Sequence, residues 1–299
     1  MPPIQAPYQA MTPLADRARP RAQLWRTVLG LILAAFFALL IAVLAVLPVA
    51  FVLGPAQLQD RLPSLVNGDT PAGVVSLLLS FLPQMLGLLL AVLVLMRRGP
   101  LSLTGPFRPA LRNFIRVGLP LFGLSLVFMP LTLQSDSVSQ NLTLAQQRPW
   151  LPAALLGLLI QTATEELIFR GYLQQQLAAR FAARWVWLGV PTLLFGLAHY
   201  APGPSGVVTV MTMLWAACFG LAAADLTART GNLGAAIALH FTNNVSAILL
   251  VGLAGNLGGL TLYQITVPPG DVTSMYLYLA MDGVSLLVSW LLARLILRR

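Results

Sequence analysis

Charged residues are scarce in this chain. They make up 9% of the 299 residues, whereas 58% are hydrophobic and the mean hydropathy is +0.81. A soluble domain carries about 25% charged residues, so this composition excludes an ordinary water-soluble protein. It predicts a chain that crosses a lipid bilayer several times.

Lysine is absent, and there is one cysteine. All 18 basic residues are arginine, which hints at a GC-rich and therefore bacterial genome. On a soluble domain the net charge of +9 would favour nucleic acid, but here the arginines lie between apolar runs, as topology signals do, and no nucleic-acid partner is expected. The single Cys218 excludes an internal disulfide and a cysteine-based zinc site.

Long apolar runs fill most of the sequence. Each is close to the ~20 residues of a spanning helix, and together they predict an all-α, polytopic membrane helix bundle of about eight transmembrane helices over residues 26–299. The eight runs are 27–53, 74–96, 117–134, 151–178, 185–201, 206–228, 232–252 and 273–293. The first exceeds the 7–15 residues of a signal-peptide core, so we expect an uncleaved span.

The segments outside these runs have distinct compositions. Residues 1–25 are rich in Pro, Ala and Arg and are predicted to be a disordered cytoplasmic tail. The glycine-rich segment 253–272 is predicted to be a flexible loop. Sixteen of the 18 arginines fall on one side of the predicted topology. The positive-inside rule then places both termini in the cytoplasm of a bacterial plasma membrane.

Few ionisable residues lie inside the apolar runs, where a charge costs about 2.5–3.5 kcal/mol and usually marks function. The chain has two glutamates, Glu165 and Glu166, both in the fourth run. Its two histidines are His199 in the fifth run and His240 in the seventh, where Asn244 follows.

Helical spacing predicts how these groups are arranged. Glu166 and Arg170 are i,i+4 with the acid first, the favourable order for an ion pair, whereas Glu165 points about 100° away. Glu165, His199 and Asn244 each lie 15 residues from the arginine at the predicted cytoplasmic end of their own helix, a depth of about 22 Å. We therefore expect one shared polar layer. Near the cytoplasmic end of the sixth run, Asp225 and Arg229 are expected to form a surface pair.

A carboxylate, two imidazoles and a carboxamide in one dry layer favour hydrolysis. A buried glutamate can take a proton from water, a histidine can position that water, and a histidine with an amide can stabilise an oxyanion. Alternatively, Glu165, His199 and His240 could bind Zn²⁺ with one position open for water. The familiar H-E-x-x-H metalloprotease pattern does not occur.

Three motifs carry a family resemblance over roughly residues 150–250. The sequence has E-E-x-x-x-R at 165–170, F-x-x-x-H at 195–199 and H-x-x-x-N at 240–244. In order and spacing this resembles the CAAX prenyl endopeptidase and bacteriocin-processing (CPBP or ABI) family of intramembrane proteases. The resemblance implies that Glu165 is the general base assisted by His199, that His240 and Asn244 form an oxyanion hole, and that Glu166 and Arg170 are a supporting pair.

The expected function is therefore an intramembrane endopeptidase acting on a membrane-embedded or lipidated peptide or protein. Two alternatives remain open at this stage. A non-catalytic membrane scaffold or bacteriocin-immunity protein would use the polar layer only for packing. A transporter would use buried Glu and His as a proton relay, but such proteins are typically built from internal repeats, and none is visible here.

Overall fold

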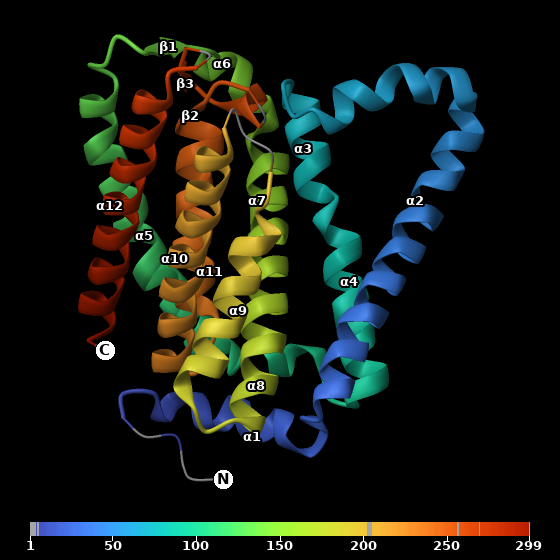
Figure 1. Cartoon of the computed structure of the whole chain (residues 1–299). Helices are drawn as coiled ribbons and strands as arrows, with labels where there is room; N and C mark the ends of the chain where they lie inside the picture. The colour runs from blue at the N-terminus through green and yellow to red at the C-terminus, as the bar shows by residue number, and fades with distance from the viewer. Residues whose placement is uncertain (1–3, 5, 202–204, 256, 269, 299) are drawn as a thin grey trace.

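The computed structural model is largely helical and describes residues 4, 6–201, 205–255, 257–268 and 270–298 (Figure 1). Within this part of the chain the α-helices are α1 (Thr12–Ala18), α2 (Leu24–Val66), α3 (Pro71–Leu79), α4 (Phe81–Ala91), α5 (Phe107–Thr132), α6 (Leu144–Gln147), α7 (Leu151–Glu166), α8 (Gln174–Arg180), α9 (Arg184–Ala198), α10 (Gly206–Thr230), α11 (Gly234–Val245) and α12 (Val272–Leu297). Stretches of π-helix follow α4, α7 and α11, at Val92–Met96, Leu167–Leu173 and Ser246–Leu250. The short strands are β1 (Val138–Gln140), β2 (Val251–Leu253) and β3 (Tyr263–Ile265).

Six helical stretches in the described residues are long and apolar enough to cross a membrane, and two shorter apolar helices accompany them. The long ones are Leu24–Gly54, Pro71–Met96, Phe107–Thr132, Leu144–Arg180, Gly206–Thr230 and Val272–Leu297, and the short ones are Arg184–Ala198 and Gly234–Leu250. All eight coincide with the apolar runs of the sequence. The largely helical architecture is confirmed, with six stretches that are candidate membrane spans. Crossing by the two short helices stays a prediction, because 15 residues of α9 rise only about 22 Å against ~30 Å of hydrocarbon.

The first long helix presents apolar side chains outward. Only 6% of its most apolar window is buried, and Phe51 is 91% exposed. A continuous apolar surface of this kind is rare on soluble monomers, so it supports an integral membrane protein. The apolar stretch ends at Gly54, whose φ of +75° favours glycine, and Figure 1 shows the chain bending sideways at this far end of α2.

The candidate site lies where α7, α9, α10 and α11 pack together. Close approach of α9 to α10 depends on Gly196, because a Cβ there would lie 2.7 Å from the Met213 carbonyl oxygen. The clustered core between these helices includes Phe195, Phe219 and Leu239, all nearly inaccessible to solvent. This dense packing holds the consecutive helices α9, α10 and α11 together beside α7.

A small three-stranded sheet closes one end of the bundle, where a flexible loop was expected. β3 pairs antiparallel with β1 and parallel with β2. The expectation for 253–272 was therefore wrong over Tyr263–Ile265. The glycine-rich composition suggested a loop. The strands that pair with β3 come from other parts of the chain, so the composition of this segment alone cannot predict the pairing.

The N-terminal segment is not a disordered tail over its described residues. Helix α1 packs against α8, and the 3₁₀ turn Gln9–Met11 before it packs against α10. The buried side chains of this segment are Met11, Leu14, Ala15 and Ala18. These four fall at the i, i+3, i+4, i+7 spacing of one helix face. The average composition of 1–25 concealed this face, since its prolines and arginines lie elsewhere. Residues 1–3 and 5 of the predicted tail lie outside the described residues.

Asp225 and Arg229 form a buried junction instead of the expected surface pair. The Asp225 carboxylate accepts Arg229 Nε at 2.7 Å, Tyr8 Oη at 2.8 Å and Trp290 Nε1 at 3.0 Å. Its side chain is 8% exposed. One carboxylate thus joins the N-terminal segment, α10 and α12. The N-terminal segment and α12 both cover this end of α10, and the sequence alone does not reveal that contact.

The Tyr8 hydroxyl provides a test of this junction. Tyr8→Phe removes one hydrogen bond to a charged acceptor, and we expect a loss of about 1–2 kcal/mol of unfolding free energy, with faster proteolysis of the N-terminal segment. Tyr200→Phe, at a side chain 64% exposed, is the matched control and should change neither. Equal effects of the two substitutions would show that Tyr8 does not anchor the segment.

Candidate active site

The adjacent glutamates at the end of α7 have different environments. Glu166 is 0% exposed, and its Oε1 contacts both Arg170 Nη1 at 3.1 Å and His240 Nδ1 at 2.9 Å. Glu165 is 13% exposed, and its Oε1 accepts Gln161 Nε2 at 2.7 Å. Neighbours on a helix point about 100° apart, so one carboxylate faces the packed interior while the other faces a partly open space.

Arg170 connects three helices around Glu166. Its side chain is 1% exposed, and Nη2 donates to the Gly220 carbonyl on α10 at 3.0 Å. Its guanidinium carbon lies 4.5 Å from the centre of the Phe195 ring on α9. A buried guanidinium needs a countercharge and hydrogen-bond acceptors. Here the countercharge comes from α7 and the acceptor from α10.

The π-helix that follows Glu166 preserves this pair. Residues Leu167–Leu173 widen the helix without breaking it at Gly171, and α8 continues the same apolar stretch. Such π segments occur frequently at functional sites. In this protein the segment carries Arg170 at the i+4 position from Glu166, so the sequence-based prediction of that ion pair is confirmed.

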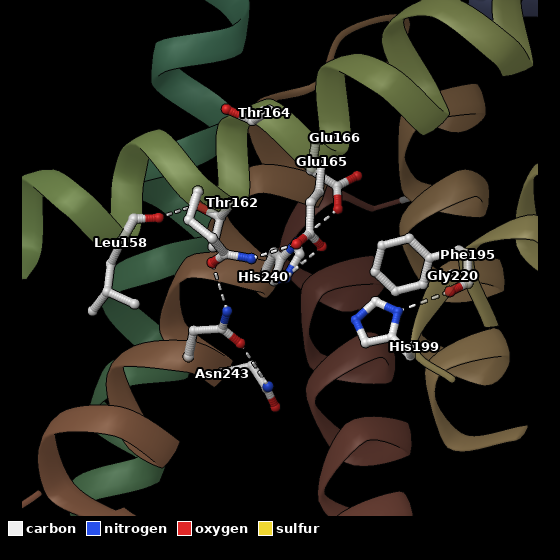
Figure 2. A network of polar contacts seen from close by, with 12 residues as sticks. Leu158, Thr162, Thr164, Glu165, Glu166, Phe195, His199, Gly220, His240 and Asn243 are labelled. Carbon is white, nitrogen blue, oxygen red and sulfur yellow. Dashed lines mark hydrogen bonds and ion pairs between the residues drawn. The ribbon is translucent and has the colours of Figure 1, made fainter. Parts of the chain in front are cut away.

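His240 on α11 lies between the two glutamates (Figure 2). Its Nδ1 contacts Glu166, and its Nε2 lies 3.7 Å from Glu165 Oε2, an ion-pair separation too long for a hydrogen bond. Because an ionised carboxylate only accepts, Nδ1 carries the hydrogen toward Glu166. The ring also packs on Phe219, with centroids 4.8 Å apart.

Asn244 joins the same network through a residue that the motifs do not include. Its Nδ2 donates to Gln161 Oε1 at 2.9 Å, and the other end of Gln161 donates to Glu165. Asn243 Nδ2 donates to Asn244 Oδ1 at 3.2 Å. Gln161 therefore links the α11 carboxamides to the Glu165 carboxylate.

His199 is close to this network but not hydrogen-bonded to it in the described residues. At the end of α9 its Nδ1 lies 2.8 Å from the Phe195 carbonyl oxygen, which can only accept, and its ring lies 4.5 Å from the Phe195 ring. The same Phe195 ring contacts His240, with centroids 6.1 Å apart. Figure 2 shows the two imidazoles near this one aromatic ring. The structure thus connects Asn244 to Glu165 through Gln161, places His240 Nε2 3.7 Å from Glu165 and adds His199 through Phe195.

Residues 147–246, one third of the chain, match the family model of the Rce1-like type II CAAX prenyl endopeptidases. This segment is an Rce1-like domain of the CPBP family. No curated protein and no solved structure matched the chain. The Rce1-like domain contains every polar residue of the network described above, and membership implies a peptidase.

The zinc set left open by the sequence does not assemble in the Rce1-like domain. No group of three or more His, Cys, Asp or Glu side chains able to hold a metal ion occurs among the described residues. The Nδ1 atoms of His199 and His240 are engaged by a carbonyl and by Glu166, which leaves Nε2 as the available ring nitrogen of each. Glu165, His199 and His240 do not come together as a metal-ligand set among the described residues.

Two features of the Rce1-like domain were missed from the sequence. Gln161 is central to the network, and its signal was its i−4 position from Glu165 inside an apolar run. Gly220 accepts from Arg170, and a Cβ there would lie 3.3 Å from Arg170 Nη2. No sequence pattern identifies Gly220, because the contact is between a side chain and a backbone carbonyl on another helix.

Proposed function

We propose that this protein is an intramembrane endopeptidase that cleaves a membrane-associated peptide or protein with water activated by Glu165. The observation that carries the proposal is the environment of that carboxylate. Oε1 is held by Gln161, whereas the buried Oε2 has no hydrogen-bond partner among the described residues and faces His240 Nε2 at 3.7 Å. A buried carboxylate oxygen that lacks a partner is the kind of group that a catalytic role explains.

In the proposed reaction, Glu165 removes a proton from water as its oxygen attacks the scissile carbonyl carbon. His199 Nε2, on the ring edge opposite the Phe195 carbonyl, orients the water. The tetrahedral intermediate then collapses by breaking the C–N bond, and Glu165 returns the proton to the leaving amine. Products are a peptide with a new carboxylate and one with a new amine.

Two donors on α11 are positioned to stabilise the oxyanion. Asn244 has two amide hydrogens, of which one goes to Gln161 and the other remains for substrate. His240 Nε2, the ring atom that faces Glu165, can donate to the oxyanion when it carries a hydrogen. Removing one such donor in other hydrolases costs about 10²–10³ in kcat.

The test is cleavage by purified full-length protein reconstituted in liposomes. The probes are a fluorescent peptide with a farnesylated C-terminal cysteine motif and the same peptide without the lipid, and mass spectrometry identifies the products. Cleavage by wild type that is lost in Glu165→Gln supports the proposal, and preference for the lipidated probe assigns the substrate class. Cleavage abolished by a chelator would contradict a metal-free mechanism. Cleavage of neither probe, with an unchanged phenotype in Glu165→Gln, would favour a scaffold.

Gln161 should act as a positioning residue in this mechanism. Gln161→Leu removes the link between Glu165 and Asn244, and we expect kcat to fall about tenfold with a smaller change in KM. Gln161→Glu restores an acceptor for Asn244 but places a second charge beside Glu165, and it should shift the pH profile of kcat. A KM effect alone, with kcat and the pH profile unchanged, would show that Gln161 serves only packing.

A further inference from the structure

Four arginines surround a cavity of about 140 Å³ where α1, the segment between α1 and α2, the end of the α4 stretch and α8 meet. They are Arg17, Arg21, Arg97 and Arg98, and Gln176 adds a polar side chain. None of the four forms an ion pair with an acid within the described residues. A lined cavity with concentrated positive charge and no countercharge is a candidate anion site.

Arg98 is held in place with one donor left over. Its Nε donates to Ser102 Oγ at 2.7 Å and its Nη2 to Gln175 Oε1 at 2.8 Å. Its Nη1 is buried and has no partner among the described residues. Burial, with the Arg17 charge nearby, lowers the pKa of Arg98 to about 10. Because this lies well above neutral pH, the guanidinium stays charged.

The neighbouring arginines are also fixed by the backbone. Arg21 Nη1 donates to the Leu95 carbonyl oxygen at 3.1 Å. Arg97 ends the π-helix with φ at +48°, a left-handed conformation that is uncommon for residues other than glycine. Strained backbone of this kind tends to persist at ligand sites, and here it holds two consecutive arginines at one cavity.

The ends of two long apolar stretches put the cavity at the level where lipid headgroups are expected. One long apolar stretch begins at Leu24 and another ends at Met96, so both terminate beside it. Trp25 is 58% exposed, and the Arg26 guanidinium lies 5.0 Å from its ring. An exposed tryptophan with an arginine at the end of an apolar helix is typical of the membrane interface.

We propose that this arginine pocket binds a phosphate-bearing anion at the membrane surface. Arginine matches phosphate oxygens through paired N–H donors, and basic pockets between helices at this level bind anionic headgroups. The cavity volume is several times the ~30 Å³ that one water molecule occupies in the liquid. A phosphate group therefore fits in it. The inference does not depend on the proposed proteolytic activity.

The test uses purified full-length protein in neutral detergent, with binding measured by native mass spectrometry. The probes are phosphatidylglycerol, phosphatidylcholine and inorganic phosphate. Arg17→Gln with Arg97→Gln removes two exposed pocket charges, and Arg108→Gln with Arg112→Gln removes two exposed charges outside the pocket. We expect the first pair to weaken phosphatidylglycerol binding at least about tenfold and the second to leave it within about twofold.

The three probes distinguish the source of the phosphate. Selective phosphatidylglycerol binding that depends on the pocket arginines assigns a lipid headgroup, and equally dependent binding of inorganic phosphate alone assigns a soluble anion. Equal weakening by both variant pairs, or indifference of all probes to the pocket pair, would overturn the proposal. Arg17→Gln alone, at an exposed helical position, repeats the test with less perturbation and should give an intermediate loss.

Discussion

Glu165→Gln is expected to lower kcat for peptide cleavage by about 10²–10⁴-fold, the contribution of a general base, while the protein remains folded. The change is nearly isosteric, and the side-chain oxygen can still accept from Gln161 Nε2. Glu165 does not pair with Arg170, whose countercharge is Glu166. Loss of proton transfer should therefore appear without loss of the surrounding network.

The measurement is single-turnover cleavage in liposomes, with thermal unfolding of each protein recorded in parallel. Asp136→Asn is the matched control, because it makes the same carboxylate-to-amide change at an exposed residue far from the site in the chain. We expect the control to keep wild-type kcat. Undiminished activity in Glu165→Gln would reject Glu165 as the base, and a large fall in unfolding temperature would assign it a structural role.

Much of the fold could be predicted because membrane helices follow from local composition. Every apolar run in the sequence corresponds to an apolar helix of the structure. The ion pair of Glu166 and Arg170 was predictable for the same reason, since i,i+4 spacing on a helix sets the distance directly. These features depend only on residues close together in the chain.

Other parts depend on contacts between distant segments. Asp225 looked like half of a surface pair, and only the folding of the N-terminal segment over α10 brings Tyr8 onto its carboxylate. β3 needs β1, more than a hundred residues earlier. His240 was expected to form an oxyanion hole with Asn244, and its contact with Glu166 depends on the relative rotation of α7 and α11. Helix rotation is set by packing, which spacing along one helix does not encode.

In the proposed mechanism the two glutamates have separate tasks. His240 contacts both, at 2.9 Å from Glu166 and 3.7 Å from Glu165. A rigid, charged Glu166 therefore fixes the imidazole that faces the more exposed Glu165. Precise placement of reacting groups can supply a large part of rate enhancement, so the stability of the inner ion pair bears directly on activity.

Arg170→Met is expected to destabilise the protein by about 3–5 kcal/mol, the cost of leaving one member of a buried ion pair uncompensated. Methionine has similar length and keeps the packing against Phe195. It removes the countercharge of Glu166 and the donor to the Gly220 carbonyl oxygen. The measurement is the unfolding free energy in bilayer discs, and cleavage activity should fall with it because His240 loses its fixed partner.

Two comparisons separate the buried charge from lost packing. Arg19→Met removes an ion pair whose arginine is 45% exposed, and such pairs contribute about 0–1 kcal/mol. Glu166→Gln combined with Arg170→Met leaves no unpaired charge at the pair, so the double variant should be more stable than Arg170→Met alone. If instead the losses of unfolding free energy from Glu166→Gln and from Arg170→Met simply added, the two residues would be energetically uncoupled. Glu166 would then have another countercharge. His240 is the other side chain that contacts that carboxylate among the described residues, so an additive result would point to His240 as the main partner of Glu166.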